Sequence, residues 1–138
     1  MSPDEVRAFL LHGRRTGKLA VAMADGHPHV MPIWFVLDGD DLVFTTAAGT
    51  VKGRWIRHDG RVSLCVDEEV APYAFVQIRG RASVSEDLDE MLRFATLIGA
   101  RYMGKERAEE FGRRNAVEGE LLVRLTPERV IAATGVAD

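Results

Sequence analysis

The predicted strands of this sequence follow one another in blocks instead of alternating with helices. The segments that we predict as strands cover residues 18–23, 29–37, 41–46, 61–67, 73–83, 120–125 and 129–133. Turns that contain Asp25-Gly26 and Asp38-Gly39 separate the first three, which we expect to form an antiparallel meander. The turn Thr126-Pro127-Glu128 joins the last two. This order favours an antiparallel sheet, so we predict a mainly β fold that closes into a β-barrel with peripheral helices.

Length and composition indicate a single globular domain over residues 1–138. Hydrophobic residues make up 46% of the chain and charged residues 28%, which is typical of globular proteins. The net charge of −3 provides no basic field for nucleic acid. No apolar run approaches the roughly 18 residues of a membrane helix, and the first residues lack the basic region of a signal peptide. We therefore expect a cytoplasmic protein with no membrane or nucleic-acid partner.

Disulfide and metal chemistry find little support in the sequence. Cys65 is the single cysteine, so no internal disulfide can form. His27 and His29 have a spacing that could place both rings on one face of a strand. No acidic or cysteine pair completes a metal site with them, so we expect no metal and assign both residues to a turn and the start of a strand.

The run from Met31 to Leu37 is continuously apolar and does not alternate with polar residues. Such a run indicates a strand that is buried on both faces, here by the core on one side and by a ligand or a partner chain on the other. Pro32 lies within the run and indicates an edge strand, a bulge or the start of regular pairing.

The segment from Phe44 to Arg57 carries the candidate binding chemistry. A predicted strand ends in the hydroxyl residues Thr45 and Thr46, and Gly49 follows in a loop. Thr50 is placed to cap a short helix that runs to about His58. Free backbone amides at a helix N-terminus form a site for an anion, and the helix dipole strengthens it.

Basic side chains surround the same helix start. Lys52 falls in the first helical turn, and Arg54 and Arg57 follow, so that all three could hold a phosphate or carboxylate. The alternative is an amphipathic surface helix whose arginines are simply solvated. Trp55 is explained either by a contact with the ligand or by packing of this helix on the barrel.

The order of these segments resembles the pyridoxamine-phosphate-oxidase-like split-barrel family of flavin and deazaflavin proteins. The chain is most similar to a short actinobacterial branch that depends on coenzyme F-420, an 8-hydroxy-5-deazaflavin. The resemblance covers about residues 5–85. It rests on Met31-Pro32-Ile33-Trp34-Phe35 ahead of Asp38-Gly39, on Phe44-Thr45-Thr46 with the loop to Lys52, on Arg61-Val62-Ser63-Leu64, and on Gly80 within Phe75–Arg81.

The resemblance implies a six-stranded antiparallel split β-barrel that forms an obligate homodimer, with two cofactor sites at the interface. It matches Thr45, Thr46, Thr50 and Lys52 to positions that bind the cofactor phosphate. It implies that Arg54 and Arg57 help to hold the phosphate or the acidic glutamyl tail. It also matches Pro32 and Trp34 to the strand that runs beside the isoalloxazine-type ring.

Other positions depart from the pattern of the family members that use FMN. Those members place an arginine and a lysine on the second strand, where Val30 and Phe35 stand here, and a glutamine on the fifth strand, near Phe75. The loss of these polar partners favours coenzyme F-420 over FMN. The C-terminal segment also lacks the substrate-binding arginine and histidine of the phosphate-oxidising members, which argues against pyridoxamine phosphate as substrate.

Three functions follow from these expectations. The first is an oxidoreductase that transfers a hydride from reduced coenzyme F-420 to an oxidised, conjugated organic acceptor. The second keeps the fold but uses FMN. The third is a non-catalytic protein that carries the cofactor or binds a small molecule, because its binding residues would look the same.

Overall fold

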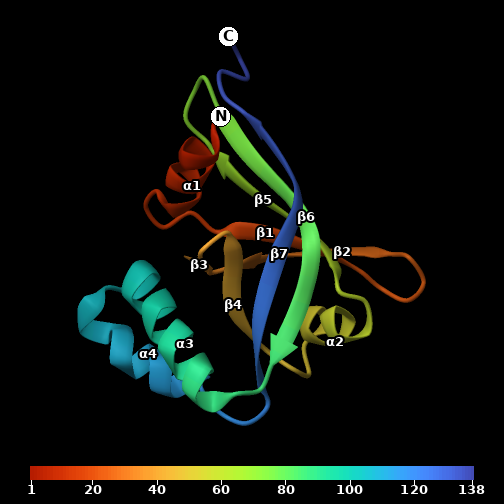
Figure 1. Ribbon diagram of the computed structural model, residues 1–138, viewed down its shortest axis with the longest axis vertical. Helices are drawn as coiled ribbons and strands as arrows, with labels where there is room; N and C mark the ends of the chain where they lie inside the picture. The colour runs from red at the N-terminus through yellow and green to blue at the C-terminus, as the bar shows by residue number, and fades with distance from the viewer.

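A computed structural model describes all residues from 1 to 138 as a curled antiparallel sheet with helices around it (Figure 1). The helices are α1 (Pro3–Leu11), α2 (Val51–His58), α3 (Leu88–Met103) and α4 (Ala108–Asn115), with a 3-10 turn at Lys105–Arg107. The strands are β1 (Gly17–Ala22), β2 (Pro28–Ile33), β3 (Val36–Asp38), β4 (Asp41–Ala47), β5 (Arg61–Glu68), β6 (Ala74–Ser85) and β7 (Glu120–Ala133). No helix combines the length and the apolar character that crossing a bilayer requires.

The seven strands form one sheet in the order β2-β1-β5-β6-β7-β4-β3, and every pair is antiparallel. The two strands at the ends of this order, β2 and β3, are consecutive in the chain and are separated only by Trp34 and Phe35. The sheet therefore curls until its two edges approach each other. The predicted mainly β class with an antiparallel barrel-like sheet is confirmed.

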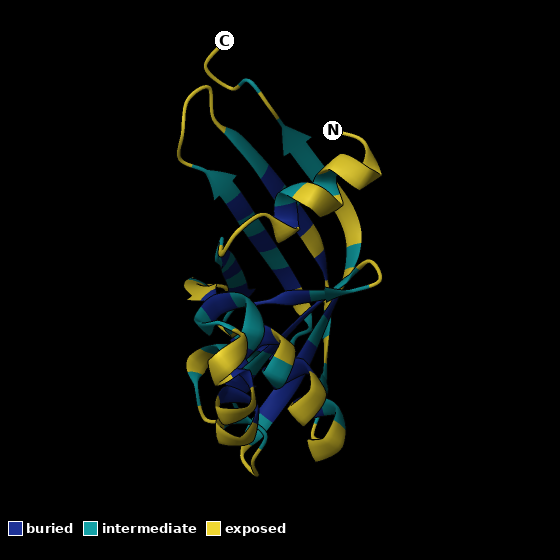
Figure 2. Cartoon of the chain, turned by 90° about the vertical axis from the view of Figure 1, so that its left-hand side faces the viewer, coloured by how far each residue is buried: buried dark blue, intermediate teal, exposed yellow.

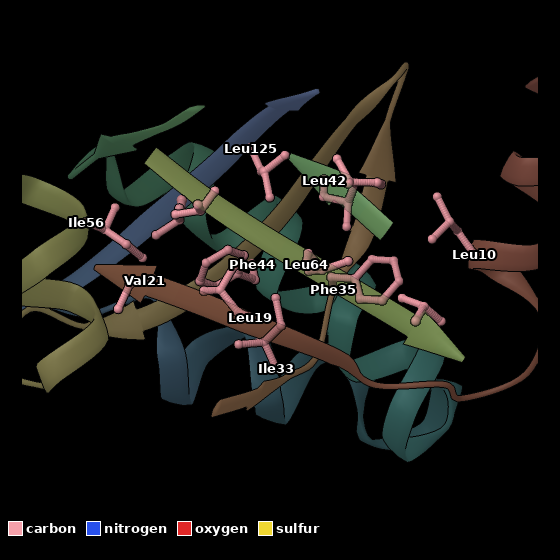
Figure 3. Packing of buried hydrophobic residues seen from close by; sticks show 14 of the residues in the cluster. Leu10, Leu19, Val21, Ile33, Phe35, Leu42, Phe44, Ile56, Leu64 and Leu125 are labelled. Atoms are coloured by element: carbon pink, nitrogen blue, oxygen red, sulfur yellow. The ribbon is translucent and has the colours of Figure 1, made fainter. Parts of the chain in front are cut away.

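The main core fills the inside of the curled sheet. It contains side chains from six of its strands, such as Leu19, Phe44 and Leu64, and it is closed at its ends by Leu10 of α1 and Ile56 of α2. Figure 3 shows these side chains pointing toward one another between the strands. Alternate residues of β1 and β5 are buried, as the period of a strand with one covered face requires.

A second, smaller core lies on the opposite face of β3, β4 and β7, beneath α3. Val43 and Leu122 contact the apolar stripe of α3 there, including Phe94 and Tyr102. The helices α3 and α4 thus cover one part of the outer sheet face, while their own outer sides remain exposed (Figure 2). The outer face of β1, β5 and β6 belongs to neither core.

The predicted meander is wrong at its second connection. β1 pairs with β2 and β3 pairs with β4, but β4 continues the sheet through β7, and β2 and β3 lie at opposite ends of the strand order. The single strand expected over residues 29–37 is broken at Trp34 and Phe35, because the chain passes there from one edge of the sheet to the other. The backbone of Phe35 bonds to the side chains of Tyr102 and Arg101 instead of to a neighbouring strand.

The two strands expected at the C-terminal end are one strand, β7, which pairs with β6 from Leu122 to Ala133. The expected turn at 126–128 is a β-bulge, because Arg79 pairs with Arg129 while the next residue, Gly80, pairs with Pro127. A bulge tolerates a proline, which has no backbone N–H to donate to the ladder. The sheet has seven strands where the resemblance implied six. The number of predicted segments was also seven, because the division of 29–37 and the joining of the last two segments cancel each other.

Candidate functional site

A cleft of about 270 Å³ brings together four of the eight residues that the sequence nominated. It lies where the β2–β3 junction and the start of α2 meet the helices α3 and α4. Its lining consists of Pro32, Ile33, Trp34, Thr45, Lys52, Ala95, Ile98, Gly99, Phe111 and Asn115. Pro32, Trp34, Thr45 and Lys52 are the nominated residues among them.

Pro32 and Trp34 form the apolar edge of this cleft. Pro32 lies near the end of β2, where it pairs with Lys18 of β1, and its side chain is exposed. The indole of Trp34 is 40% exposed although it stacks on the ring of Tyr102 at 5.0 Å between ring centroids. An exposed aromatic ring with a packed back face is a suitable wall for a planar ligand.

The polar side of the cleft is formed by Lys52 and Thr45. The Lys52 side chain is half-buried, and burial lowers the pKa of its ammonium group from the usual value. The charge of Glu120 opposes this effect, but no carboxylate lies within ion-pair distance of Lys52. A desolvated cation without a direct partner attracts an anion more strongly than a solvated one does.

Thr46 and Thr50 have their hydroxyl groups engaged within the protein. The two hydroxyl oxygens lie 3.2 Å apart, and the Thr50 hydroxyl donates to the carbonyl of Ala47 at 2.7 Å. Thr50 also caps α2, because its Oγ1 accepts from the backbone N–H of Gly53 at 3.1 Å. These threonines therefore build the loop and the start of the helix, and the cleft is not lined by either of them.

Gly53 allows the first turn of α2 to lie directly against the end of β4. A Cβ atom at this position would collide with the carbonyl oxygen of Ala47, which is backbone and cannot move aside cheaply. We expect Gly53→Ala to lower the free energy of unfolding by about 1–3 kcal/mol, as overpacking does. Gly49→Ala is the matched control, since its Cβ meets no atom within 4 Å. Equal stability of the two variants in urea denaturation would contradict the close approach.

Arg54 and Arg57 lie on the exposed side of α2, outside the cleft. The guanidinium of Arg57 is 3.7 Å from the carboxylate of Glu86, whereas the side chain of Arg54 forms neither a hydrogen bond nor an ion pair. The structure thus does not bring these two arginines together with Lys52 around one small anion. They remain available to a longer acidic group that extends from the cleft along the helix.

The wall formed by α3 and α4 was missed by the sequence analysis. Phe111 and Asn115 of α4 face the cleft together with Gly99 of α3. Gly99 and Phe111 mark a close packing of the two helices, because a Cβ on Gly99 would collide with the Cβ of Phe111. Peripheral helices were expected, but no residue pattern in α3 or α4 indicates which strand ends they meet in the fold.

Glu120 at the start of β7 competes with any anion for Lys52. Burial raises the pKa of Glu120, and Lys52 partly offsets the shift. A bound anion favours the protonated form of both groups, so its affinity should fall as the pH rises through either pKa.

We expect Glu120→Gln to tighten binding of inorganic phosphate about 3- to 10-fold at neutral pH, the effect of one removed like charge. Calorimetric titration measures this, with the exposed Glu118→Gln as control; equal affinities would contradict the competition.

A larger cavity of about 750 Å³ lies between α1 and the β6–β7 ribbon. Apolar residues such as Val6, Ile78 and Val130 form much of its lining. Its one basic side chain, Arg7, already donates a 2.6 Å hydrogen bond to the carbonyl of Gly39. Of these two cavities, charge therefore favours the smaller cleft at Lys52 for an anionic ligand.

The groups at Lys52 fit the phosphate-bearing end of a flavin-type cofactor. Cofactor-sized pockets have volumes of about 300–1,000 Å³. The cleft is therefore large enough for a phosphate and its linker, but it is too small to hold a tricyclic ring as well. The ring has to lie at the mouth, beside the exposed Pro32 and Trp34. A curled antiparallel sheet with such a cleft beside its edge strand defines a split-barrel protein of the flavin- and deazaflavin-binding class.

The comparison with protein families agrees with this class. Residues 2–133 match the model for pyridoxamine 5'-phosphate oxidase, and the chain therefore belongs to this family. The resemblance inferred from the sequence is confirmed. No curated protein matches the chain.

Solved structures with the same fold have varied functions. A conserved hypothetical protein from Mycobacterium tuberculosis has a TM-score of 0.86 at 24% identity, and the match covers 98% of this chain and 86% of that one. An F-420 reductase has a TM-score of 0.71 at 25% identity, with 90% and 94% covered. The heme storage protein HutZ from Vibrio cholerae has a TM-score of 0.76 at 21% identity, with 99% and 98% covered.

Proposed function

We propose that this protein is an oxidoreductase that transfers a hydride between coenzyme F-420 and a conjugated organic acceptor. The observation that carries the proposal is the half-buried ammonium of Lys52, which lies without a direct carboxylate partner in a cleft whose mouth is an exposed proline and tryptophan. The similarity to an F-420 reductase supports the same cofactor class.

The side chains at the family's FMN contacts favour the deazaflavin over FMN. Val30 is 63% exposed and offers no charge, and Phe35 is fully buried in the core and cannot reach a ligand. Phe75 brings an aromatic ring where FMN-dependent members place an amide. Arg54 and Arg57 lie exposed on α2, where they suit the acidic glutamyl tail that coenzyme F-420 carries and FMN lacks.

When bound, the deazaflavin supplies the hydride chemistry, and the chain supplies binding and orientation. Lys52 and Thr45 hold the phosphate, while Trp34 and Pro32 provide an apolar surface that excludes water from one side of the ring. Orientation of two bound reactants can account for several kcal/mol of rate enhancement. The acceptor surface is open and apolar, which suits a quinone, a tetrapyrrole or an enone.

A second copy of the chain is proposed to cover the outer face of β1, β5, β6 and β7. Small and apolar side chains occupy its middle, among them Ala20, Cys65 and Ile131. One end of this face carries Arg79 and Arg129 opposite each other, whereas the other end carries Asp67 opposite Phe75. The Asp67 carboxylate also forms a 2.9 Å ion pair with Lys18, which partly neutralises the negative charge of this end.

The charges on this face favour one arrangement of the two copies. A two-fold axis that lies in the interface and runs across the strands would set the basic end of one copy on the acidic end of the other. An axis along the strands would set like charges together. This arrangement leaves the edge strand β2 and the mouth of the cleft at the border of the interface.

A hydride-transfer assay tests the proposed function. The purified protein is mixed with reduced coenzyme F-420 and menadione, and oxidation of the cofactor is followed by the return of its visible absorbance. We expect turnover that depends on enzyme concentration, and a dissociation constant for coenzyme F-420 lower than that for FMN. Tight FMN binding with no binding of coenzyme F-420 would overturn the cofactor assignment, and tight binding with no transfer to quinone or enone acceptors would indicate a carrier.

A further inference from the structure

The break between β2 and β3 is held by two consecutive residues near the end of α3. The hydroxyl of Tyr102 accepts a hydrogen bond from the backbone N–H of Phe35 at 3.2 Å and donates one to the carbonyl of Arg15 at 2.8 Å. Tyr102 is 5% exposed. These bonds replace the strand ladder at the point where the chain turns from one edge of the sheet to the other.

Arg101 ties the same junction to the N-terminal segment. Its guanidinium donates to the carbonyls of Phe35 at 2.8 Å, Leu10 at 2.7 Å and Gly13 at 3.1 Å. It also lies over the rings of Phe35 and Tyr102, at 4.7 Å and 4.9 Å from their centroids. Three of the five N–H donors of this guanidinium bond to backbone carbonyls, so the main role of Arg101 is to hold the backbone.

Trp34, the residue before Phe35, depends on this junction for its orientation. Its indole stacks on the ring of Tyr102 with an angle of 4° between the planes, and Phe111 of α4 contacts it at a tilt. Trp34 also lines the cleft. One tyrosine thus fixes both the backbone beside Trp34, through its hydroxyl, and the plane of the indole, through its ring.

We propose that Tyr102, supported by Arg101, is a positioning residue that holds the Trp34 indole as a fixed wall of the cleft. A rigid wall reduces the conformational entropy that is lost when a planar ligand binds. Tyr102 reaches the ligand only through Trp34, since it does not line the cleft. The effect on cofactor affinity rests on the proposed function, whereas the positioning of Trp34 does not.

Fluorescence of Trp34 tests the proposal without a cofactor. The chain has two tryptophans, so Trp55→Phe leaves Trp34 as the sole emitter. In this background Tyr102→Phe removes only the hydroxyl, and Tyr102→Leu removes the ring as well. Phe94→Leu is the matched control, because Phe94 is a buried ring on the same helix that stacks on neither tryptophan.

We expect acrylamide quenching of Trp34 to increase in Tyr102→Phe and to increase further in Tyr102→Leu, while Phe94→Leu loses stability and keeps the quenching of the parent. In titrations with coenzyme F-420 and FMN, Tyr102→Phe should raise the dissociation constant of the bound cofactor about 5- to 10-fold, because the loss of both hydroxyl hydrogen bonds loosens Trp34.

Parent-like quenching in Tyr102→Phe would overturn the proposal, as would an equal increase in Phe94→Leu. Tyr102→Phe preserves the aromatic packing, so the test stands even where Tyr102→Leu does not fold. If the unmodified protein binds neither cofactor, the proposed function fails, and the quenching result alone still decides whether Tyr102 positions Trp34.

Discussion

Replacing Lys52 with alanine is expected to weaken cofactor binding about 10- to 150-fold. This range corresponds to about 1.5–3 kcal/mol, the contribution of a hydrogen bond to a charged group. The ammonium lies half-buried in the cleft, and no other cation lines it. No neighbouring basic side chain can therefore take over the contact of Lys52 with the phosphate. Equilibrium dialysis with coenzyme F-420 and with FMN measures the change directly.

Arg54→Ala is the control for Lys52→Ala, because Arg54 lies on the same helix but outside the cleft. It should leave FMN binding within about twofold of the unmodified protein, since surface charges contribute little. A larger loss with Arg54→Ala than with Lys52→Ala would move the phosphate site from the cleft to the exposed face of α2.

Reversing the charge of Arg79 is expected to weaken the proposed dimer at least about tenfold, because like charges that face each other cost several kcal/mol. Arg79 lies opposite Ser63 and Arg129 on the outer sheet face, and no ion pair within the chain satisfies it. In Arg79→Glu the altered end of one copy would face the acidic end of the other. Sedimentation equilibrium of the variant and the unmodified protein measures the dissociation constant.

Arg113→Glu serves as the matched charge reversal for Arg79→Glu. Arg113 is exposed on α4, away from the outer face of β5 and β6. It changes the net charge equally, so both proteins experience the same general repulsion. A monomeric unmodified protein at micromolar concentration, or equal weakening by the two reversals, would contradict the proposed interface.

The sequence predicted the class of the fold because its strands follow in blocks and carry clear turn signals. It could not predict the order of the strands. The turn at Asp38-Gly39 correctly joins β3 to β4, but the break at Trp34 depends on Tyr102, which lies more than sixty residues further along the chain. Bonds of this kind leave no local pattern in either segment.

The sequence nominated the side of the cleft that consecutive residues form at the end of β4 and the start of α2. It did not indicate the side that arises from the packing of α3 and α4. Lys52 and Thr45 could be nominated because a strand end and a capped helix follow each other directly. The cap itself was predicted correctly, as the Thr50 hydroxyl accepts from Gly53. The same bond explains why Thr50 is not a lining residue of the cleft. The spacing of residues alone could not distinguish a threonine that caps the helix from one that binds a ligand. Phe111 and Asn115 enter the cleft only through the packing of α4 on α3.

A crystal structure of the protein with bound coenzyme F-420 would test the proposed binding mode. We expect the phosphate within hydrogen-bond distance of the Lys52 Nζ, with the deazaflavin ring beside Trp34 and Pro32. A cofactor bound in the cavity beneath α1, or one whose phosphate makes no contact with Lys52, would contradict it.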